Sequence, residues 1–211
     1  MKNMHAISAA ILTVSCVVAL AKRVETHEIQ IIINQNSASN VFAANVGGSI
    51  TDNIATTLPA GTTSIQNGLI YPKGTVNLNQ DSYTVDKNGN PLTQLNSIGS
   101  WQSSNFQLVT SDLNNSPAPG TETTQTFNTF TFNPSNNPSN PNQIMTMGME
   151  EAVNTIAPGV HVSTIPMAVL GGFGKNQSAN GTAIAQLYTA PDGNSILMVV
   201  KFNKKIVVNI P

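Results

Sequence analysis

The sequence predicts an all-β protein built as a single antiparallel domain. Short segments that alternate apolar and polar residues follow one another, and residues typical of turns separate them. The dipeptides Asn88-Gly89 and Asp192-Gly193 are strong signals for β-hairpins. One segment, residues 150–156, has helical character, and Pro158-Gly159 ends it. This pattern favours a barrel or a sandwich, and closure into a barrel removes exposed strand edges.

The amino-acid composition agrees with an all-β protein and argues against nucleic acid and membrane surfaces as binding partners. Charged residues make up 9% of the 211 residues, against about 25% in average soluble domains. Asn, Ser, Thr, Gln and Gly supply the polarity instead, as suits an extracellular or periplasmic β-protein. The chain has no basic stripe for nucleic acid and no amphipathic basic helix for a membrane surface.

Residues 1–21 are predicted to be a cleaved signal peptide. Lys2 gives a positive start, residues 6–20 are almost entirely apolar or small, and Ala19-Leu20-Ala21 fits a cleavage site. The apolar run is too short for a comfortable membrane span. The alternatives are a buried N-terminal helix and a lipoprotein acylated on Cys16, which the apolar residues after Cys16 disfavour.

Cleavage after Ala21 would leave a secreted or periplasmic protein without cysteine or membrane segment. Cys16 is the one cysteine of the chain, so its loss would exclude disulfides, thiol catalysis and thiolate metal sites. Loss of Lys2 would leave eight basic and ten acidic residues and a net charge of −2. Such a protein depends on its own hydrophobic core for stability.

The mature chain is predicted to consist of an N-terminal extension, residues 22–70, and a barrel domain, residues 71–211. In the extension, residues 27–33 alternate and then become apolar throughout, which predicts a strand that enters a core. A second short strand is expected around residues 41–46. Residues 45–61 show no clear period and are expected to be extended surface chain.

The barrel domain is predicted to be a series of short strands. They are residues 74–78, 82–86, 95–102, 105–110, 126–133, 143–149, 160–170, 181–188, 194–202 and 204–210. Residues 111–124 form a loop that cannot continue a sheet, and residues 134–141, with three prolines, are expected to form a mobile hairpin tip.

Two of these strands have informative faces. In residues 126–133, Phe130 and Phe132 share one face. In residues 143–149, Met145, Met147 and Met149 share a face, and such a stripe is predicted to pack in the core because methionine fills irregular space. Copper binding by this stripe is the alternative.

The barrel is predicted to be organised around residues 166–188. An apolar strand leads into Gly171, Gly172 and Gly174, and a second strand opens at Gly181. Glycine reaches positive φ and lets another backbone approach closely, so these residues predict a tight β-corner. A phosphate-binding loop is the alternative, but it requires a helix after the glycines, and here alternating strand residues follow.

Two segments of this stretch, residues 168–175 (AVLGGFGK) and 179–183 (ANGTA), resemble the C-terminal signature of dirigent proteins, whose barrel relatives are the allene oxide cyclases. Phe173 replaces the usual Thr of the signature, and Asn180 replaces the usual Arg. Weaker similarity lies upstream, at Asp86 and around Trp101. The resemblance covers about two thirds of the chain and implies an eight-stranded antiparallel barrel without a cofactor.

The resemblance also implies a type of activity. Dirigent proteins bind phenoxy radicals that a separate oxidase makes and steer their coupling. Allene oxide cyclases position an unstable fatty-acid epoxide for ring closure. In both cases the protein holds a reactive apolar molecule in one pose.

The residues themselves supply little conventional catalytic chemistry. A Ser-His-acid triad or a zinc site would need His27 or His161, and we interpret His161 as structural and His27 as lying near a mobile start. The neighbours Glu150 and Glu151 point to different sides and are predicted to lie in a solvated turn. We therefore expect no metal and no cofactor.

Four residues are the candidates for contact with a small hydrophobic ligand. Tyr83 and Asp86 are the polar groups best placed to orient it, and Trp101 and Phe106 are candidate apolar walls. Each of them also has a purely structural interpretation.

Three functions remain open. The first is a secreted dirigent-like barrel that binds or orients a small hydrophobic or phenolic compound without a cofactor. The second is a non-catalytic interaction protein that acts through its loops at a surface or host partner, with a homo-oligomer left open. The third is a cyclase or isomerase of the allene oxide cyclase type, which the replacements at Phe173 and Asn180 disfavour.

The predicted processing can be tested on the exported protein. We expect its intact mass to correspond to a chain that begins at Lys22 and lacks any thiol, because the signal would be removed with Cys16. A retained N-terminus, or a lipid mass on Cys16, would contradict the prediction.

Overall fold

The computed structural model describes residues 22–34, 41–43, 50–51, 57–58, 60–109, 111–112, 121–132, 142–152 and 161–210. The predicted signal peptide, Cys16 and the proline-rich hairpin tip lie outside these residues. In the part of the chain that the structure describes, no helix is long and apolar enough to cross a membrane.

The secondary structure is almost entirely β. The strands are β1 (Lys22–Asn34), β2 (Val41–Ala43), β3 (Ile50–Thr51), β4 (Thr57–Leu58), β5 (Thr63–Pro72), β6 (Gly99–Gln107), β7 (Ser111–Asp112), β8 (Glu122–Phe132), β9 (Asn142–Ala152), β10 (His161–Phe173), β11 (Gly181–Thr189) and β12 (Ser195–Ile210). Two short 3₁₀ helices are η1 (Gln94–Asn96) and η2 (Gly174–Asn176).

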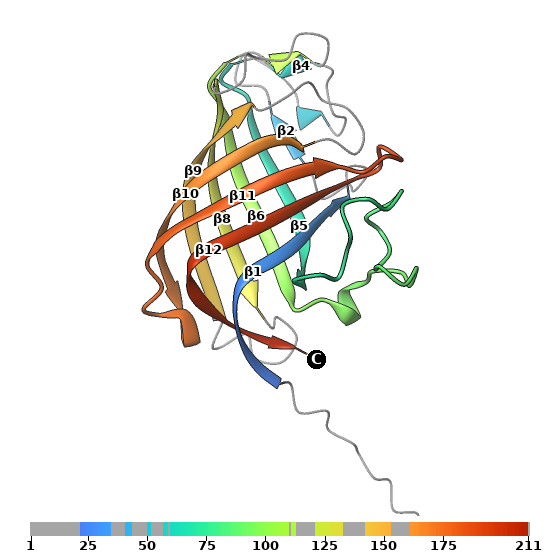
Figure 1. Ribbon diagram of the computed structural model, residues 1–211. Helices are drawn as coiled ribbons and strands as arrows, with labels where there is room; N and C mark the ends of the chain where they lie inside the picture. Colours follow the sequence, from blue (N-terminus) through green and yellow to red (C-terminus); the bar gives the residue numbers. More distant parts are fainter. Residues whose placement is uncertain are drawn as a thin grey trace, which may run out of the picture.

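Eight strands form a closed antiparallel barrel, which confirms the predicted fold class. Their order is β1-β12-β11-β10-β9-β8-β6-β5, and pairing of β1 with β5 closes the circle (Figure 1). β2 and β3 extend the sheet beyond β5, and β4 pairs with β7 in a separate two-stranded sheet. Closure pairs the edges that an open sheet would expose.

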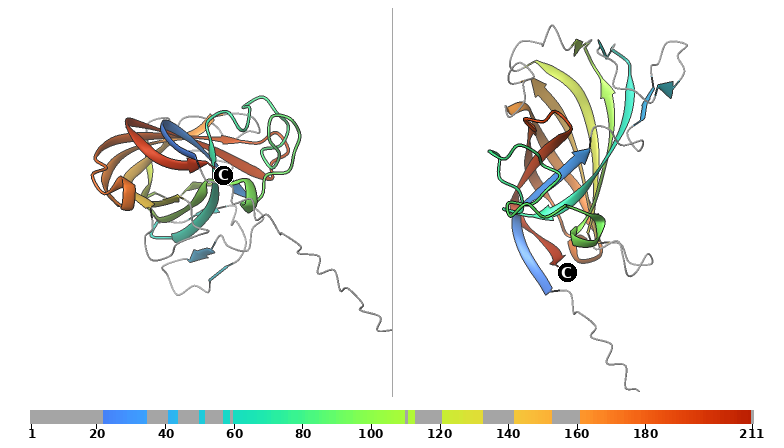
Figure 2. Two further views of the ribbon diagram at one scale, coloured as in Figure 1. Left: turned by 90° about the horizontal axis from the view of Figure 1, so that it is seen from below. Right: turned by 90° about the vertical axis from the view of Figure 1, so that its right-hand side faces the viewer.

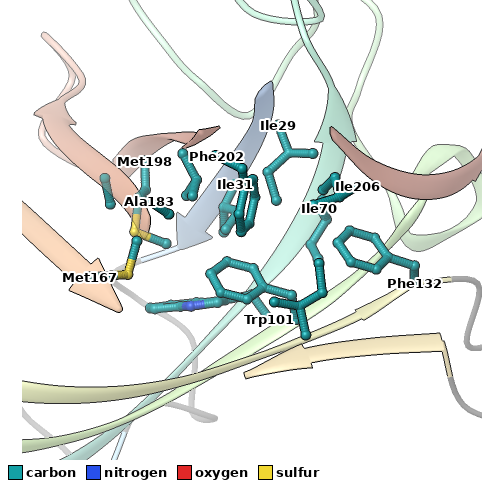
Figure 3. Close-up of a cluster of buried hydrophobic side chains, with 14 of the residues drawn as sticks. Ile29, Ile31, Ile70, Trp101, Phe132, Met167, Ala183, Met198, Phe202 and Ile206 are labelled. Atoms are coloured by element: carbon teal, nitrogen blue, oxygen red, sulfur yellow. The ribbon is translucent and has the colours of Figure 1, made fainter. Parts of the chain in front are cut away.

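Period-2 alternation fills the barrel with apolar side chains (Figure 3). Phe130 and Phe132 face inward and are fully buried, as their shared face predicted. The ring of Phe130 meets that of Phe202 edge to face, with centroids 5.7 Å apart. Burial of each such side chain stabilises the fold by about 1.5–3 kcal/mol.

Residues 73–98 cover the outer face of the barrel and form a second core there. Tyr71 and Leu197 on the barrel pack with Val76 and Tyr83 of this segment. Both views of Figure 2 show the segment lying outside the strands. This second core explains why the run of isoleucines in β1 is apolar on both faces, because Ile32 joins it while its neighbours fill the interior.

The prediction of strands at residues 74–78 and 82–86 is wrong. Side chains accept hydrogen bonds from several backbone N–H groups of this segment, where a neighbouring strand would do so in a sheet. The Gln30 amide accepts from the Val76 N–H and donates to its carbonyl, both at 2.9 Å. The Asp86 carboxylate accepts from the N–H groups of Asn88 and Asn90, each at 2.8 Å, and holds a turn. Asn and Asp make such local bonds in competition with strands.

The predicted boundary at residues 70 and 71 requires correction. It cuts through β5, and it places β1 in an extension although β1 pairs with β12 along most of its length and with β5. The predicted short strand near residue 41 is present as β2. Sequence periodicity indicates that a segment is a strand but carries no signal for its partner.

Three further predictions about strands also require correction. Residues 150–152 belong to β9 rather than to a helical turn, and residues 153–156 lie outside the described part. The segments predicted at 194–202 and 204–210 form one strand, β12. The methionine stripe faces outward, where Met147 is 41% exposed, because the interior face of β9 carries Ile144 and Thr146.

The predicted β-corner connects β10 to β11 through η2. Gly174 and Gly181 have φ angles of 63° and 111°, values that favour glycine. Gly172 has an ordinary φ, so of the two reasons predicted for the glycines it is the close approach of another backbone that applies here. A Cβ atom there would collide with the backbone carbonyls of Asn176 and Gln143.

Replacement of Gly172 by Val should therefore destabilise the protein. We expect a loss of about 1–3 kcal/mol, the usual cost of forcing extra atoms into a packed region. Chemical denaturation would measure it, with Ala168→Val as the matched control because Ala168 is exposed on the same strand. Equal stability of the Gly172→Val variant and wild type would contradict the close backbone approach.

Candidate functional site

The interior of the barrel has an apolar part and a polar part. The polar part lies on neighbouring strands, at the end where β6 and β9 stop and β8 and β10 begin. Its buried side chains are Ser103, Gln107, Thr124, Thr126, Asn128, Thr146 and Ser163. All of them are neutral, and alternation along each strand directs them to the inside.

A hydrogen-bond network joins the two parts. The indole N–H of Trp101 donates to Asn128 Oδ1 at 3.1 Å, and Asn128 Nδ2 donates to Thr126 Oγ1 at 3.1 Å. The Thr146 hydroxyl contacts Met167 Sδ at 3.1 Å. Buried polar groups need such partners, so this network fixes the orientation of Trp101 at the base of the polar part.

Glu150 brings a carboxyl group to this polar interior. Its carboxyl is desolvated although the residue as a whole is only half-buried, and this burial raises its pKa. Hydrogen bonds with the side chains of Ser163 and Thr124 act in the opposite direction without cancelling the effect. Thr124 also links Glu150 to a third strand, because its hydroxyl lies 3.0 Å from Gln107 Oε1.

Sequence reasoning placed Glu150 in a solvated turn and so missed this position. The sequence carries no signal for it, because the apolar period of this segment falls on the methionines, whereas the buried face carries Ile144, Thr146 and Gly148. Thr124 lies directly opposite Glu150 in the regular register of the β8–β9 pair, and β8 bulges just beyond it, between Glu122 and Thr124.

The four residues that the sequence suggested for a ligand do not come together. Trp101 lies inside the barrel, 3% exposed. Tyr83 is buried in the second core outside it, where its hydroxyl donates to the Leu78 carbonyl at 3.0 Å. Burial raises the pKa of Tyr83.

Asp86 and Phe106 lie on the surface. The hydrogen bonds that Asp86 accepts, first of all from Asn90, lower its pKa, as expected for a carboxylate that holds a turn. Phe106 is 39% exposed on the outer face of β6. Only Trp101 of the four therefore borders the polar interior.

The outer face of the barrel has two open grooves. One, of about 610 Å³, runs beside the second core and has a floor of neutral polar side chains that includes Gln102, Thr129 and Gln143. The other, of about 540 Å³, is lined by Phe106 and Phe127. Among the described residues, no group of three or more His, Cys, Asp or Glu could hold a metal ion.

The raised pKa of Glu150 predicts a specific pH dependence of stability. The unfolded chain loses this proton near the ordinary value of 4.5, whereas the folded protein holds it to higher pH. Its stabilising contribution is therefore complete below pH 4.5 and is lost as pH rises through the raised folded pKa.

The Glu150→Gln variant should remove this dependence. We expect its free energy of unfolding, relative to wild type, to increase from pH 4.5 upward and then level off. Denaturation curves over this pH range would measure the difference, with Glu151→Gln, at the next position of β9, as the matched control. A difference between Glu150→Gln and wild type that does not change with pH would contradict the assignment.

No family model matches this chain, and neither does any curated protein. Solved structures similar to it include those of the pterocarpan synthase dirigent proteins PsPTS1 and GePTS1. The first is 15% identical over 90% of this chain and 96% of its own, with a TM-score of 0.48. The second is 14% identical over 90% of this chain and 86% of its own, with a TM-score of 0.46. Both are structures of dirigent proteins, the family that residues 168–183 resemble.

Proposed function

We propose that this protein is a cofactor-free barrel that binds and orients a small phenolic or hydrophobic compound in the polar part of its interior. The observation that carries the proposal is the Glu150 carboxyl, set among hydroxyl and amide groups inside the barrel. Secretion or export to the periplasm is part of the proposal, and the low content of charged residues supports it.

A carboxyl group in this environment lowers the stability of the fold, and a functional role would explain why the protein has one there. Its contacts are with the neutral side chains of Ser163 and Thr124, and neither ion pair recorded among the described residues includes Glu150. Desolvation without a cationic partner disfavours the charged form. Perturbed carboxyl groups of this kind concentrate at functional sites.

The surrounding groups suit a phenolic ligand. A phenol hydroxyl can donate to the carboxylate or accept from the protonated acid, so Glu150 can orient it in either state. Trp101, held by Asn128, offers an apolar surface at the inner end of the polar part, six positions along β6 from Gln107. Cavity shape and one polar group would then fix the pose of the bound molecule.

The other suggested residues take structural roles in this proposal. Tyr83 anchors residues 73–98 to the barrel, and Asp86 holds the turn at its tip. If the protein is a cyclase, Glu150 is the described residue best suited to donate a proton, because its pKa is raised.

A specific surface feature favours the second candidate, an interaction protein. Ile65, Phe106, Phe127 and Met147 are each 39–43% exposed on adjacent strands, β5, β6, β8 and β9. Phe127 pairs directly with Met147 across the sheet. Single exposed apolar residues are common, but neighbours on several strands form a patch of the kind that contacts other molecules.

A ligand screen distinguishes the two candidates. Burial of about 300 Å² of apolar ligand surface would supply about 7 kcal/mol before the cost of association, so we expect micromolar binding at best. Phenols and fatty alcohols should raise the melting temperature of wild type. The rise should be smaller for Glu150→Ala, and Glu151→Ala and Asp86→Asn are the matched controls.

Binding by the control variants should equal that of wild type. Equal binding by Glu150→Ala would contradict the role of Glu150. If no compound binds and the interior proves to be filled with side chains, the interaction protein becomes the better proposal.

A further inference from the structure

A separate pocket lies at the other end of β10 from Ser163, where the glycine corner meets β12. It has a volume of about 250 Å³ and lies between η2, the start of β11 and β12. Figure 1 shows η2 and the end of β12 at the lower end of the barrel. The Glu150 site and this pocket therefore lie at opposite ends of β10 and share no residue.

An irregularity in β12 forms one wall of the pocket. The register with β1 shifts between Thr26 and Glu28, so that residues 202–205 bulge. Phe202 and Ile206 point into the barrel, whereas the residues between them are exposed. A regular strand would direct Lys204 and Lys205 to opposite faces, so the bulge is what places both on the outside.

The bulge and η2 are held in place by amide side chains. Asn203 Oδ1 accepts from the Thr182 N–H at 3.0 Å. Asn176 is 4% exposed; its amide donates to Asn142 Oδ1 at 2.8 Å and accepts from the Val207 N–H at 3.0 Å. These bonds join η2 to β9 and β12 and join β11 to β12, so both walls are preformed.

The pocket is basic at its mouth and apolar at its floor. Lys175, Lys204 and Lys205 line it together with neutral polar residues, and no acidic residue does. Its floor consists of side chains of the hydrophobic core, namely Ile144, Val169, Phe202 and Ile206.

The lysines are incompletely neutralised. Lys205 pairs with Glu25 at 3.5 Å, but both side chains are more than half exposed, so the pair is weak. Lys204 Nζ donates to Asn180 Oδ1, a neutral acceptor. Lys175 forms no ion pair among the described residues. The mouth therefore carries a net positive charge beside an apolar floor.

We propose that this pocket binds a small organic carboxylate, with its apolar body on the floor and its carboxylate among the lysines. At the volume of about 30 Å³ that one water occupies, 250 Å³ holds about eight non-hydrogen atoms, close to the nine of benzoate. Charge and apolar contact would both be needed for binding, since exposed lysines alone bind anions weakly.

The test uses benzoate as the probe and benzamide as its neutral equivalent. In calorimetric titrations of the full-length protein, benzoate should bind about tenfold more tightly than benzamide, and its affinity should fall as salt is added. Lys175→Met and Lys204→Met should each weaken benzoate binding about two- to fivefold, the range for exposed charge pairs. Lys87→Met, on the distant turn at Asn88, is the matched control.

Two further variants separate this site from the Glu150 site and from simple ion binding. The Glu150→Gln variant should bind benzoate with the affinity of wild type, whether or not its affinity for phenols changes. Ala179→Leu should weaken benzoate binding without removing charge, because Ala179 lines the pocket.

Three results would overturn the proposal. They are equal binding of benzoate and benzamide, unchanged benzoate binding by the Lys175→Met/Lys204→Met double variant, and binding of acetate as tight as that of benzoate. The last would indicate an adventitious ion only. Because both lysines are exposed, their variants should fold normally, and unchanged melting temperatures would verify this.

Discussion

Closure of the barrel by β1 is the constraint on which the rest of the structure depends. This strand pairs with β12 on one side and with β5 on the other, so that it joins the two ends of the eight-stranded sheet. Its side chains also supply both cores, because Ile31 fills the interior and Ile32 packs beneath residues 73–98. Without β1, two long strand edges and both cores would meet solvent.

The closed wall explains how polar groups can be retained inside. Each strand satisfies its backbone hydrogen bonds through its neighbours, so interior polar side chains need only bond to one another. The network from Trp101 through Asn128 to Thr126 does this for the neutral groups. Glu150 is the exception, since a desolvated carboxyl without a cation remains energetically unfavourable.

A departure from regular strand geometry shapes the pocket beside the glycine corner. The bulge in β12 turns Lys204 and Lys205 to the same side. The glycine corner contributes in the same way, because Gly172 lets the backbone of Asn176 approach closely. In a barrel, where alternation otherwise dictates which side chains face inward, such irregularities are the means by which neighbouring residues change faces.

The sequence by itself determined the all-β class, the inward face of Phe130 and Phe132, the hairpin turn at Asp192-Gly193 and the glycine corner. These features depend on local periodicity and on backbone conformations that few residues adopt, and both are visible in a single sequence. Tertiary structure alone decided that β1 closes the barrel, that residues 73–98 form a covering segment, and that Glu150 lies inside. Each of these depends on which distant strand pairs with which, and on where a bulge shifts the register, and neighbouring residues carry no signal for either.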